Sequence, residues 1–156
     1  MSDIIEIERK FLVDPAAWQE QGEPLVIRQG FLATTEKLVC RVRQKGEAFY
    51  LSVKADLDGF IRHDFEYAIP ALDGQIMLEQ HCERAPVEKT RWHVPFAGNI
   101  WEVDVFEGAN AGLIVAEIEL SHADQTFEKP DWVGEEVTDD PRYLNNRLYV
   151  TPYSTW

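Results

Sequence analysis

The chain has 156 residues, and its 15 Lys and Arg against 28 Asp and Glu give a net charge of −13. Hydrophobic residues make up 45% of the sequence, too many for a disordered chain and enough for a single domain over residues 1–156 with its own core. The negative charge argues against a nucleic-acid binder and against a basic protein of the membrane surface. It leaves an anionic substrate open, because that depends on where the positive charges lie.

The expected compartment is the cytoplasm, with no membrane partner. The first residues, MSDIIEIERKFLV, carry acids where a secretory signal carries bases, and no run approaches the roughly 20 apolar residues that span a bilayer. Cys40 and Cys82 have no metal-ligand or redox-motif spacing, which is typical of reduced, buried thiols.

Eight segments alternate apolar and polar residues with the period of a strand, and turn signals such as Lys45-Gly46 separate them. Their number and spacing favour a mainly β fold, an eight-stranded, mostly antiparallel barrel or sandwich with a few covering helices. In chain order, the expected strands are residues 3–13, 25–32, 37–44, 48–55, 60–69, 86–94, 99–106 and 113–120.

Three helices are expected between and after these strands. Asp14-Pro15 resembles a capped start and opens a short helix over residues 14–19. Residues 71–82 form the second, with Leu72, Ile76 and Met77 on one side. The third begins at Thr138-Asp-Asp-Pro and runs to about residue 148. We expect helices to cover the outward strand faces, which are rich in Trp, Phe and Val.

The polar strand faces carry neighbouring charges of one sign, since residues i and i+2 of a strand point the same way. Strands 37–44 and 86–94 align bases, whereas strands 99–106 and 113–120 align acids. A solvated face normally mixes signs because like charges repel. If these faces look into a closed barrel, its interior holds seven bases and eight acids: Lys10, Arg41, Arg43, Lys54, Arg62, Lys89 and Arg91, with Glu6, Glu8, Asp64, Glu66, Glu102, Asp104, Glu117 and Glu119.

Burying so many charges without a ligand would cost too much free energy, so a closed barrel must be wet inside or hold a ligand. Arg and Lys suit phosphate oxygens, and paired carboxylates suit Mg²⁺ or Mn²⁺. The pattern therefore indicates a polyanion bound together with divalent cations. The alternative is an antiparallel sheet with one solvated, charged face.

The segment Glu6-Ile-Glu8-Arg-Lys10 resembles the ExExK signature of the CYTH superfamily, the triphosphate tunnel metalloenzymes. Six later elements follow in the family's order, so the resemblance covers nearly the whole chain, and the tail is similar to that of short bacterial members. Asp64 stands where the family often has Glu. The six elements are Arg41-Val-Arg43, Ser52-Val-Lys54, Arg62-His-Asp64-Phe-Glu66, Lys89-Thr-Arg91, Glu102-Val-Asp104 and Glu117-Ile-Glu119.

The resemblance implies an antiparallel eight-stranded tunnel that binds a triphosphate-containing small molecule and two divalent ions, Mg²⁺ or Mn²⁺. It assigns the metal bound to the substrate to Glu6, Glu117 and Glu119. It assigns a second, catalytic metal to Glu8, Glu66, Glu102 and Asp104. It assigns the phosphates to Arg41, Arg43, Lys54, Lys89 and Arg91, together with Arg62.

Lys10 is the position that the resemblance suggests for orienting or deprotonating the attacking water. A metal-bound hydroxide is the competing source of the nucleophile.

The expected reaction is hydrolysis of inorganic tripolyphosphate to pyrophosphate and phosphate. A class IV adenylate cyclase, which converts ATP to cyclic AMP, and a thiamine triphosphatase would use the same phosphate site, but this compact chain has no obvious loop for their organic groups. A non-catalytic polyphosphate or nucleotide binder would be expected to have a broken acidic wall, yet the Glu6/Glu8 and Glu117/Glu119 pairs are intact. The sequence leaves the preferred metal open, as well as a homodimer through the outward aromatic face.

Overall fold

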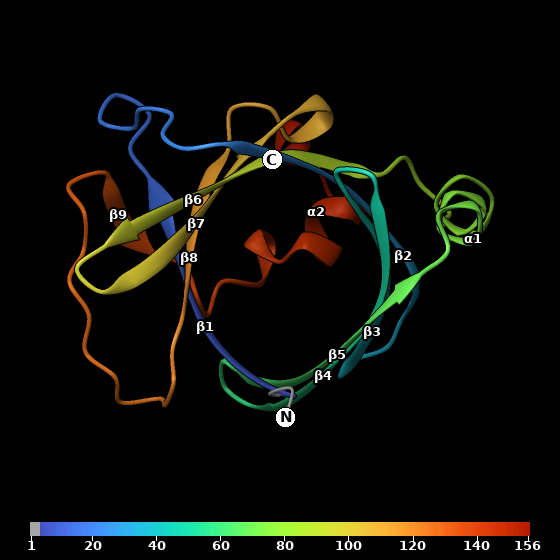
Figure 1. Ribbon diagram of the computed structural model, residues 1–156, viewed down its shortest axis with the longest axis horizontal. Coiled ribbons are helices and arrows are strands. Elements are labelled where there is room, and N and C mark those ends of the chain that lie inside the picture. The colour runs from blue at the N-terminus through green and yellow to red at the C-terminus, as the bar shows by residue number, and fades with distance from the viewer. Residues whose placement is uncertain (1–3) are drawn as a thin grey trace.

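The computed structural model describes residues 4–156, in which nine strands form one sheet that closes on itself. The strands follow the order β5-β4-β3-β2-β6-β7-β8-β1, and β1 closes the ring by pairing with β5. All pairings are antiparallel, and Figure 1 looks into the resulting ring. The strands are β1 (Ile5–Val13), β2 (Pro24–Thr34), β3 (Leu38–Lys45), β4 (Ala48–Asp58), β5 (Ile61–Ile69), β6 (Val87–Phe96), β7 (Asn99–Phe106), β8 (Ile114–Glu119) and β9 (Val133–Glu136).

The eight expected strands are confirmed with ends shifted by at most three residues, although residue 3 lies outside the described part of the chain. The ninth strand, β9, was not predicted because its sequence, VGEE, is short and does not alternate. β9 pairs with the end of β1, where Phe11 lies opposite Glu136 and Val13 opposite Val133. It therefore extends the sheet beside β1 past the point where the pairing with β5 ends.

The helix expected over 71–82 is confirmed as α1 (Ala71–Ile76), which continues as the π-helix η1 (Met77–His81). The three apolar residues expected on one side have different surroundings: Met77 packs against the cluster around Phe49, whereas Leu72 is 66% exposed and Ile76 is 37% exposed. The helix instead approaches the sheet through Gly74, which lies so close to the Phe49 ring that a Cβ at this position would overlap it. Leu78 of η1 then packs into the same small cluster as Phe49.

The helix expected over 14–19 is wrong, because the structure has only a turn there. Asp14 does cap this turn: its carboxylate accepts from the Ala16 backbone, and its carbonyl accepts from the Trp18 backbone. The chain then leaves helical geometry, and the Trp18 ring packs edge-on against Trp132 at a centroid distance of 5.1 Å. Tertiary packing thus overrides a local helix signal.

The last expected helix is divided into the 3-10 helix η3 (Pro141–Tyr143) and α2 (Asn145–Val150). Its cap is Asp140, whose carboxylate accepts from the Arg142 backbone, and not Thr138. The Thr138 hydroxyl instead accepts a hydrogen bond from the Lys10 backbone in β1. Leu144 has an extended backbone between the two helices, which explains the break.

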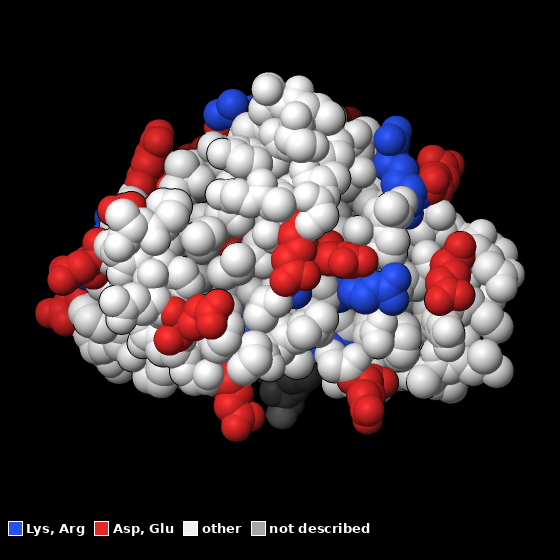
Figure 2. Space-filling view, turned by 90° about the horizontal axis from the view of Figure 1, so that it is seen from above, with Lys and Arg blue, Asp and Glu red and all other residues white. Residues whose placement is uncertain are grey.

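The exterior is where the acidic composition is visible. On the face that Figure 2 shows, acidic side chains are widely spread and basic side chains are fewer. Five of the bases expected inside the barrel are only 1% to 7% exposed, which removes a third of the 15 Lys and Arg from the surface: Lys10, Arg41, Arg43, Lys89 and Arg91.

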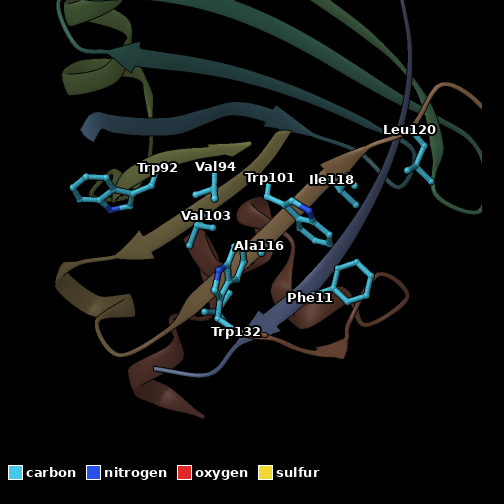
Figure 3. Packing of buried hydrophobic residues seen from close by; sticks show 10 residues of the cluster. Phe11, Trp92, Val94, Trp101, Val103, Ala116, Ile118, Leu120 and Trp132 are labelled. Atoms are coloured by element: carbon cyan, nitrogen blue, oxygen red, sulfur yellow. The ribbon is translucent and has the colours of Figure 1, made fainter. Parts of the chain in front are cut away.

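The main apolar core lies on the outer face of the strands and surrounds Trp101 (Figure 3). Trp101 is fully buried and meets Phe11, Phe127 and Trp132 edge-on, with ring centroids 5.6 to 6.0 Å apart. The expectation that helices cover this face is wrong here, because loop residues such as Trp18 and Phe127 supply the cover.

A second apolar cluster lies inside one end of the barrel. Leu148 and Tyr149 of α2 pack there against Phe31, Val87 and other strand residues. In Figure 1, α2 accordingly lies within the ring of strands. The same inward strand faces thus change from apolar at this end to charged further along.

Among the described residues, no helix has the length and apolar character that crossing a membrane requires.

Trp101→Ala should lower the free energy of unfolding by about 3–5 kcal/mol, because it opens a cavity at the centre of the outer core. Chemical denaturation with circular dichroism measures this change. Phe96→Ala, at an aromatic residue of the same hairpin that is 37% exposed, should cost about 1 kcal/mol or less. Equal losses in the two variants would contradict the placement of the core around Trp101.

Candidate active site in the barrel interior

The barrel interior holds a cavity of about 410 Å³ lined mainly by charged side chains. All seven bases and seven of the eight acids expected inside the barrel line it. The remaining acid, Asp104, is 1% exposed and lies behind Lys89 and Arg91, to which it is ion-paired. The structure therefore brings together the whole set of charges that the strand pattern places on one face.

Along a single strand, neighbouring inward-facing charges have the same sign. The register between adjacent strands nevertheless places bases of one strand opposite acids of the next. Lys54 of β4 lies opposite Asp64 of β5. Arg91 of β6 lies opposite Asp104 of β7 in the same way. Such cross-strand pairs stabilise a sheet, whereas like charges placed opposite each other destabilise it.

The basic side of the cavity is built on β3. Arg41 and Arg43 are both 7% exposed, and Glu66 of β5 accepts a 2.9 Å hydrogen bond from Arg43. Ser52 donates to the same Glu66 carboxylate and accepts from Arg41. Burial, followed by the charge of Arg43, lowers the pKa of Arg41 to about 9. The shift reflects first the loss of solvent around the guanidinium and then repulsion from Arg43, and Asp64, Glu66 and Glu6 oppose it.

A second group of buried bases lies on β6 and pairs with carboxylates of β7. Lys89 lies 2.7 Å from Asp104, and Arg91 binds the same carboxylate through two nitrogens. Arg91 also donates a 2.8 Å hydrogen bond to Glu102. Burial lowers the pKa of Lys89 to about 8, although Asp104 opposes the shift.

Glu6 forms a third ionic cluster near the start of β1. Its carboxylate accepts from Lys54 at 2.9 and 3.0 Å and from Arg62 at 2.8 Å. Burial disfavours the charged form of Glu6, but these two bases outweigh it and hold its pKa well below the usual range.

The acidic side of the cavity spans β1, β8 and β7, where like charges do lie opposite each other. Glu8 pairs in register with Glu119, and Glu102 pairs with Glu117. Glu8, Glu102 and Glu117 each offer an oxygen within 4.8 Å of the others, which is close enough for one cation to contact all three. Burial, and then the charges of Glu117 and Glu6, raise the pKa of Glu8 well above its usual value. The base Arg62 approaches the Glu8 carboxylate only to 3.9 Å, so no close ion pair occupies its oxygens and the donor set fits a hard divalent cation.

Lys10 stands between the acidic side and the C-terminal segment. Its ammonium lies 3.4 Å from Glu117 and donates a 3.1 Å hydrogen bond to the backbone carbonyl of Tyr143. The side chain is buried, so these two oxygens hold the ammonium at the cavity wall. It also borders a second cavity of about 740 Å³, which shares Glu8 and Arg62 with the first.

Lys45 and Asn145 line the cavity but were not among the predicted site residues. Lys45 follows Arg41 and Arg43 at the same two-residue spacing, so extending strand 37–44 by one residue would have found it. Asn145 reaches the cavity from α2, and Gln29 of β2 supports it through a 2.8 Å hydrogen bond. No local sequence signal places these two amides together.

His93 of β6 lies 3.3 Å from Glu102, and its side chain is 48% exposed.

Comparison with known proteins identifies a family and several relatives for this chain. The family model of the CYTH domain matches residues 4–146. An inorganic triphosphatase from Acetivibrio thermocellus is 42% identical over 151 residues, which is 97% of each chain. An inorganic triphosphatase from Nitrosomonas europaea is 39% identical over 94% of this chain and 97% of its own. A crystal structure that bears the name inorganic triphosphatase is 36% identical, covers 93% of this chain and 94% of its own, and superimposes with a TM-score of 0.67.

The lowered pKa of Lys89 predicts that its contribution to anion binding disappears as the pH rises through about 8, because only the protonated amine attracts phosphate. Tripolyphosphate binding should be measured by calorimetry in EDTA from pH 7 to pH 9, for wild type and for Lys89→Arg. Arginine stays charged, so the affinity ratio of the variant to wild type should rise several-fold over this range. The ionisation of tripolyphosphate is common to both proteins and cancels. A ratio that is independent of pH would contradict the assignment.

Proposed function

The chain belongs to the CYTH domain family, and we propose that it hydrolyses inorganic tripolyphosphate to pyrophosphate and phosphate inside its barrel. The observation that carries this proposal is the cavity in the barrel interior, which has basic residues on one side and the closely spaced carboxylates of Glu8, Glu102 and Glu117 on another. A chain of phosphates needs cations around it, and carboxylates alone would repel it unless metal ions stood between them. The names of the two curated relatives support the same reaction.

The phosphate chain is proposed to bind along the basic side of the cavity. Phosphoryl transfer depends mainly on positioning and on stabilisation of charge, and arginine forks match phosphate oxygens well. Lys45 joins the predicted set because it lines the same cavity. The proposed phosphate-binding residues are Arg41, Arg43, Lys45, Lys54, Arg62, Lys89 and Arg91.

The metal ions are proposed to be Mg²⁺ or Mn²⁺, two per site, held by the predicted carboxylates. Glu8, Glu102 and Glu117 have the best support, because their oxygens already lie within 4.8 Å of one another. A divalent ion there would supply positive charge to the phosphates and would lower the pKa of a bound water. The remaining proposed ligands are Glu6, Glu66, Asp104 and Glu119.

Three of these remaining carboxylates are paired with bases: Glu6 with Lys54, Glu66 with Arg43 and Asp104 with Lys89. We propose that substrate and metal exchange these partners. The bases turn to phosphate oxygens, and the released carboxylates turn to the cations. Each charge then has an opposite charge in both states, so the barrel stays folded when empty and when loaded.

Lys10 is proposed to orient the attacking water. Its ammonium is fixed by the Tyr143 carbonyl and by Glu117, one of the proposed metal ligands, so it lies beside the place where metal and phosphate would meet. A protonated lysine at this position holds a water oxygen by donating to it and stabilises charge on the reacting phosphate.

A cytoplasmic location is proposed as well. Cys40 and Cys82 are both free thiols, as in proteins of reducing compartments.

Purified protein should release phosphate from tripolyphosphate in the presence of Mg²⁺ or Mn²⁺ and none in EDTA. Pyrophosphate, ATP and thiamine triphosphate, incubated in parallel, should be poorer substrates because the cavity wall is mostly charged. Released phosphate and cyclic AMP are measured together. No phosphate from tripolyphosphate with either metal would overturn the proposal, and cyclic AMP from ATP would point to the cyclase.

Glu8→Gln should leave the protein folded and reduce metal-dependent turnover by more than about 100-fold, because a neutral amide of the same shape is a much poorer ligand for a hard cation. Its thermal midpoint should stay the same or rise, since an amide avoids the cost of burying a carboxylate as well as the repulsion from Glu117 and Glu6. Mn²⁺ binding followed by electron paramagnetic resonance should weaken in parallel. Glu128→Gln, an exposed residue, is the control. Unchanged Mn²⁺ binding and turnover in Glu8→Gln would remove Glu8 from the metal site.

A further inference from the structure

Asn145 is held at the cavity wall by two buried side chains from different strands. Its Oδ1 atom accepts a 3.0 Å hydrogen bond from the Lys89 ammonium and a 2.8 Å hydrogen bond from the Gln29 amide. Gln29 is fully buried and Lys89 is 1% exposed. Neither partner can move far, so the position of the Asn145 side chain is well defined.

The chemistry of lysine fixes which way the Asn145 amide points. An ammonium group can only donate, so the Asn145 atom that faces Lys89 must be the carbonyl oxygen. Gln29 donates to the same oxygen, and this leaves the two protons of the Asn145 amide nitrogen. Among the hydrogen bonds of residues 4–156, none uses these protons, and Asn145 lines the charged cavity.

Protein groups likewise accept hydrogen bonds from most of the protons of the Lys89 ammonium. Asp104 lies 2.7 Å from it and Asn145 accepts from it, so one of its three protons is left for a ligand. The Asn145 amide nitrogen therefore adds donors next to a base that has few to offer. Unlike another lysine, it adds them without adding charge.

We propose that Asn145 is a substrate-binding residue: its amide NH₂ donates to a phosphate oxygen of tripolyphosphate, while its carbonyl oxygen positions Lys89. This inference rests on the proposed triphosphatase function. It makes the C-terminal segment part of the binding site, because Tyr143, two residues earlier, holds Lys10 through its carbonyl. One short segment thereby contacts a lysine on β1 and a lysine on β6.

The donor can be observed directly by NMR, since the chain has a mass of only 18.0 kDa. In ¹⁵N-labelled wild type, the Asn145 side-chain resonances are identified by their absence from Asn145→Asp. Adding tripolyphosphate in EDTA, where no hydrolysis occurs, should shift these proton resonances downfield. Resonances that stay in place at saturating tripolyphosphate would overturn the proposal.

Affinity gives an independent measurement. Asn145→Asp keeps the oxygen that accepts from Lys89 and Gln29 but replaces the NH₂ donor with a charge. Asn146→Asp adds the same charge at the next residue, which also lines the cavity, and so measures the effect of charge alone. Calorimetry in EDTA should show tripolyphosphate binding about 10- to 100-fold weaker in Asn145→Asp than in Asn146→Asp, because hydrogen bonds to charged groups contribute that much.

Equal affinities of the two variants would show that Asn145 only supports Lys89 and would overturn the proposed contact. Thermal midpoints of both variants confirm that each is folded. The proposed function is tested separately. If wild type binds tripolyphosphate in EDTA but does not hydrolyse it with Mg²⁺, the proposed reaction is wrong. The NMR result then still decides whether Asn145 contacts the phosphate.

Discussion

Charge compensation inside a closed barrel is the constraint on which the rest of this structure depends. Buried charges cost several kcal/mol each unless they are paired with good geometry. Here nearly every inward-facing base meets a carboxylate from another strand, as in the Lys89–Asp104 and Lys54–Glu6 pairs. The outer face of the same strands holds the Trp101 core, so the barrel has its main apolar core outside and its ionic network inside.

The balance of this network explains the unusual composition of the chain. Once Lys45 is included, eight bases and eight acids face the interior, which is formally neutral. The remaining seven bases and 20 acids give the rest of the molecule the full net charge of −13. A strongly acidic protein can therefore carry an anion-binding interior. The local imbalance between the arginine side and the Glu8–Glu102–Glu117 side then separates the places proposed for phosphate and for metal.

The sequence is enough to predict what depends on local periodicity. Alternation locates all eight barrel strands, and the phase of the charges within them identifies the cavity wall, including Glu117 on β8 and Arg41 on β3. It does not reveal which charges pair, because strand register is set by the whole sheet. The sequence also predicts a helix after Asp14 that does not form, because the packing of Trp18 against Trp132 outweighs the local capping signal. The role of Asn145 is not predicted, because it depends on contacts with β2 and β6 that are more than 50 residues away in sequence.

The exchange of ion-pair partners would be visible in a crystal structure of the protein with tripolyphosphate and Mn²⁺, trapped through a slow variant such as Lys10→Ala, which keeps all the proposed metal ligands. We expect Arg43 to leave Glu66 for a phosphate oxygen, and Lys54 to leave Glu6 in the same way. We also expect Mn²⁺ beside the carboxylates of Glu102 and Glu117. A complex in which the phosphates lie outside the barrel while the internal ion pairs stay intact would contradict both the location of the site and its mechanism.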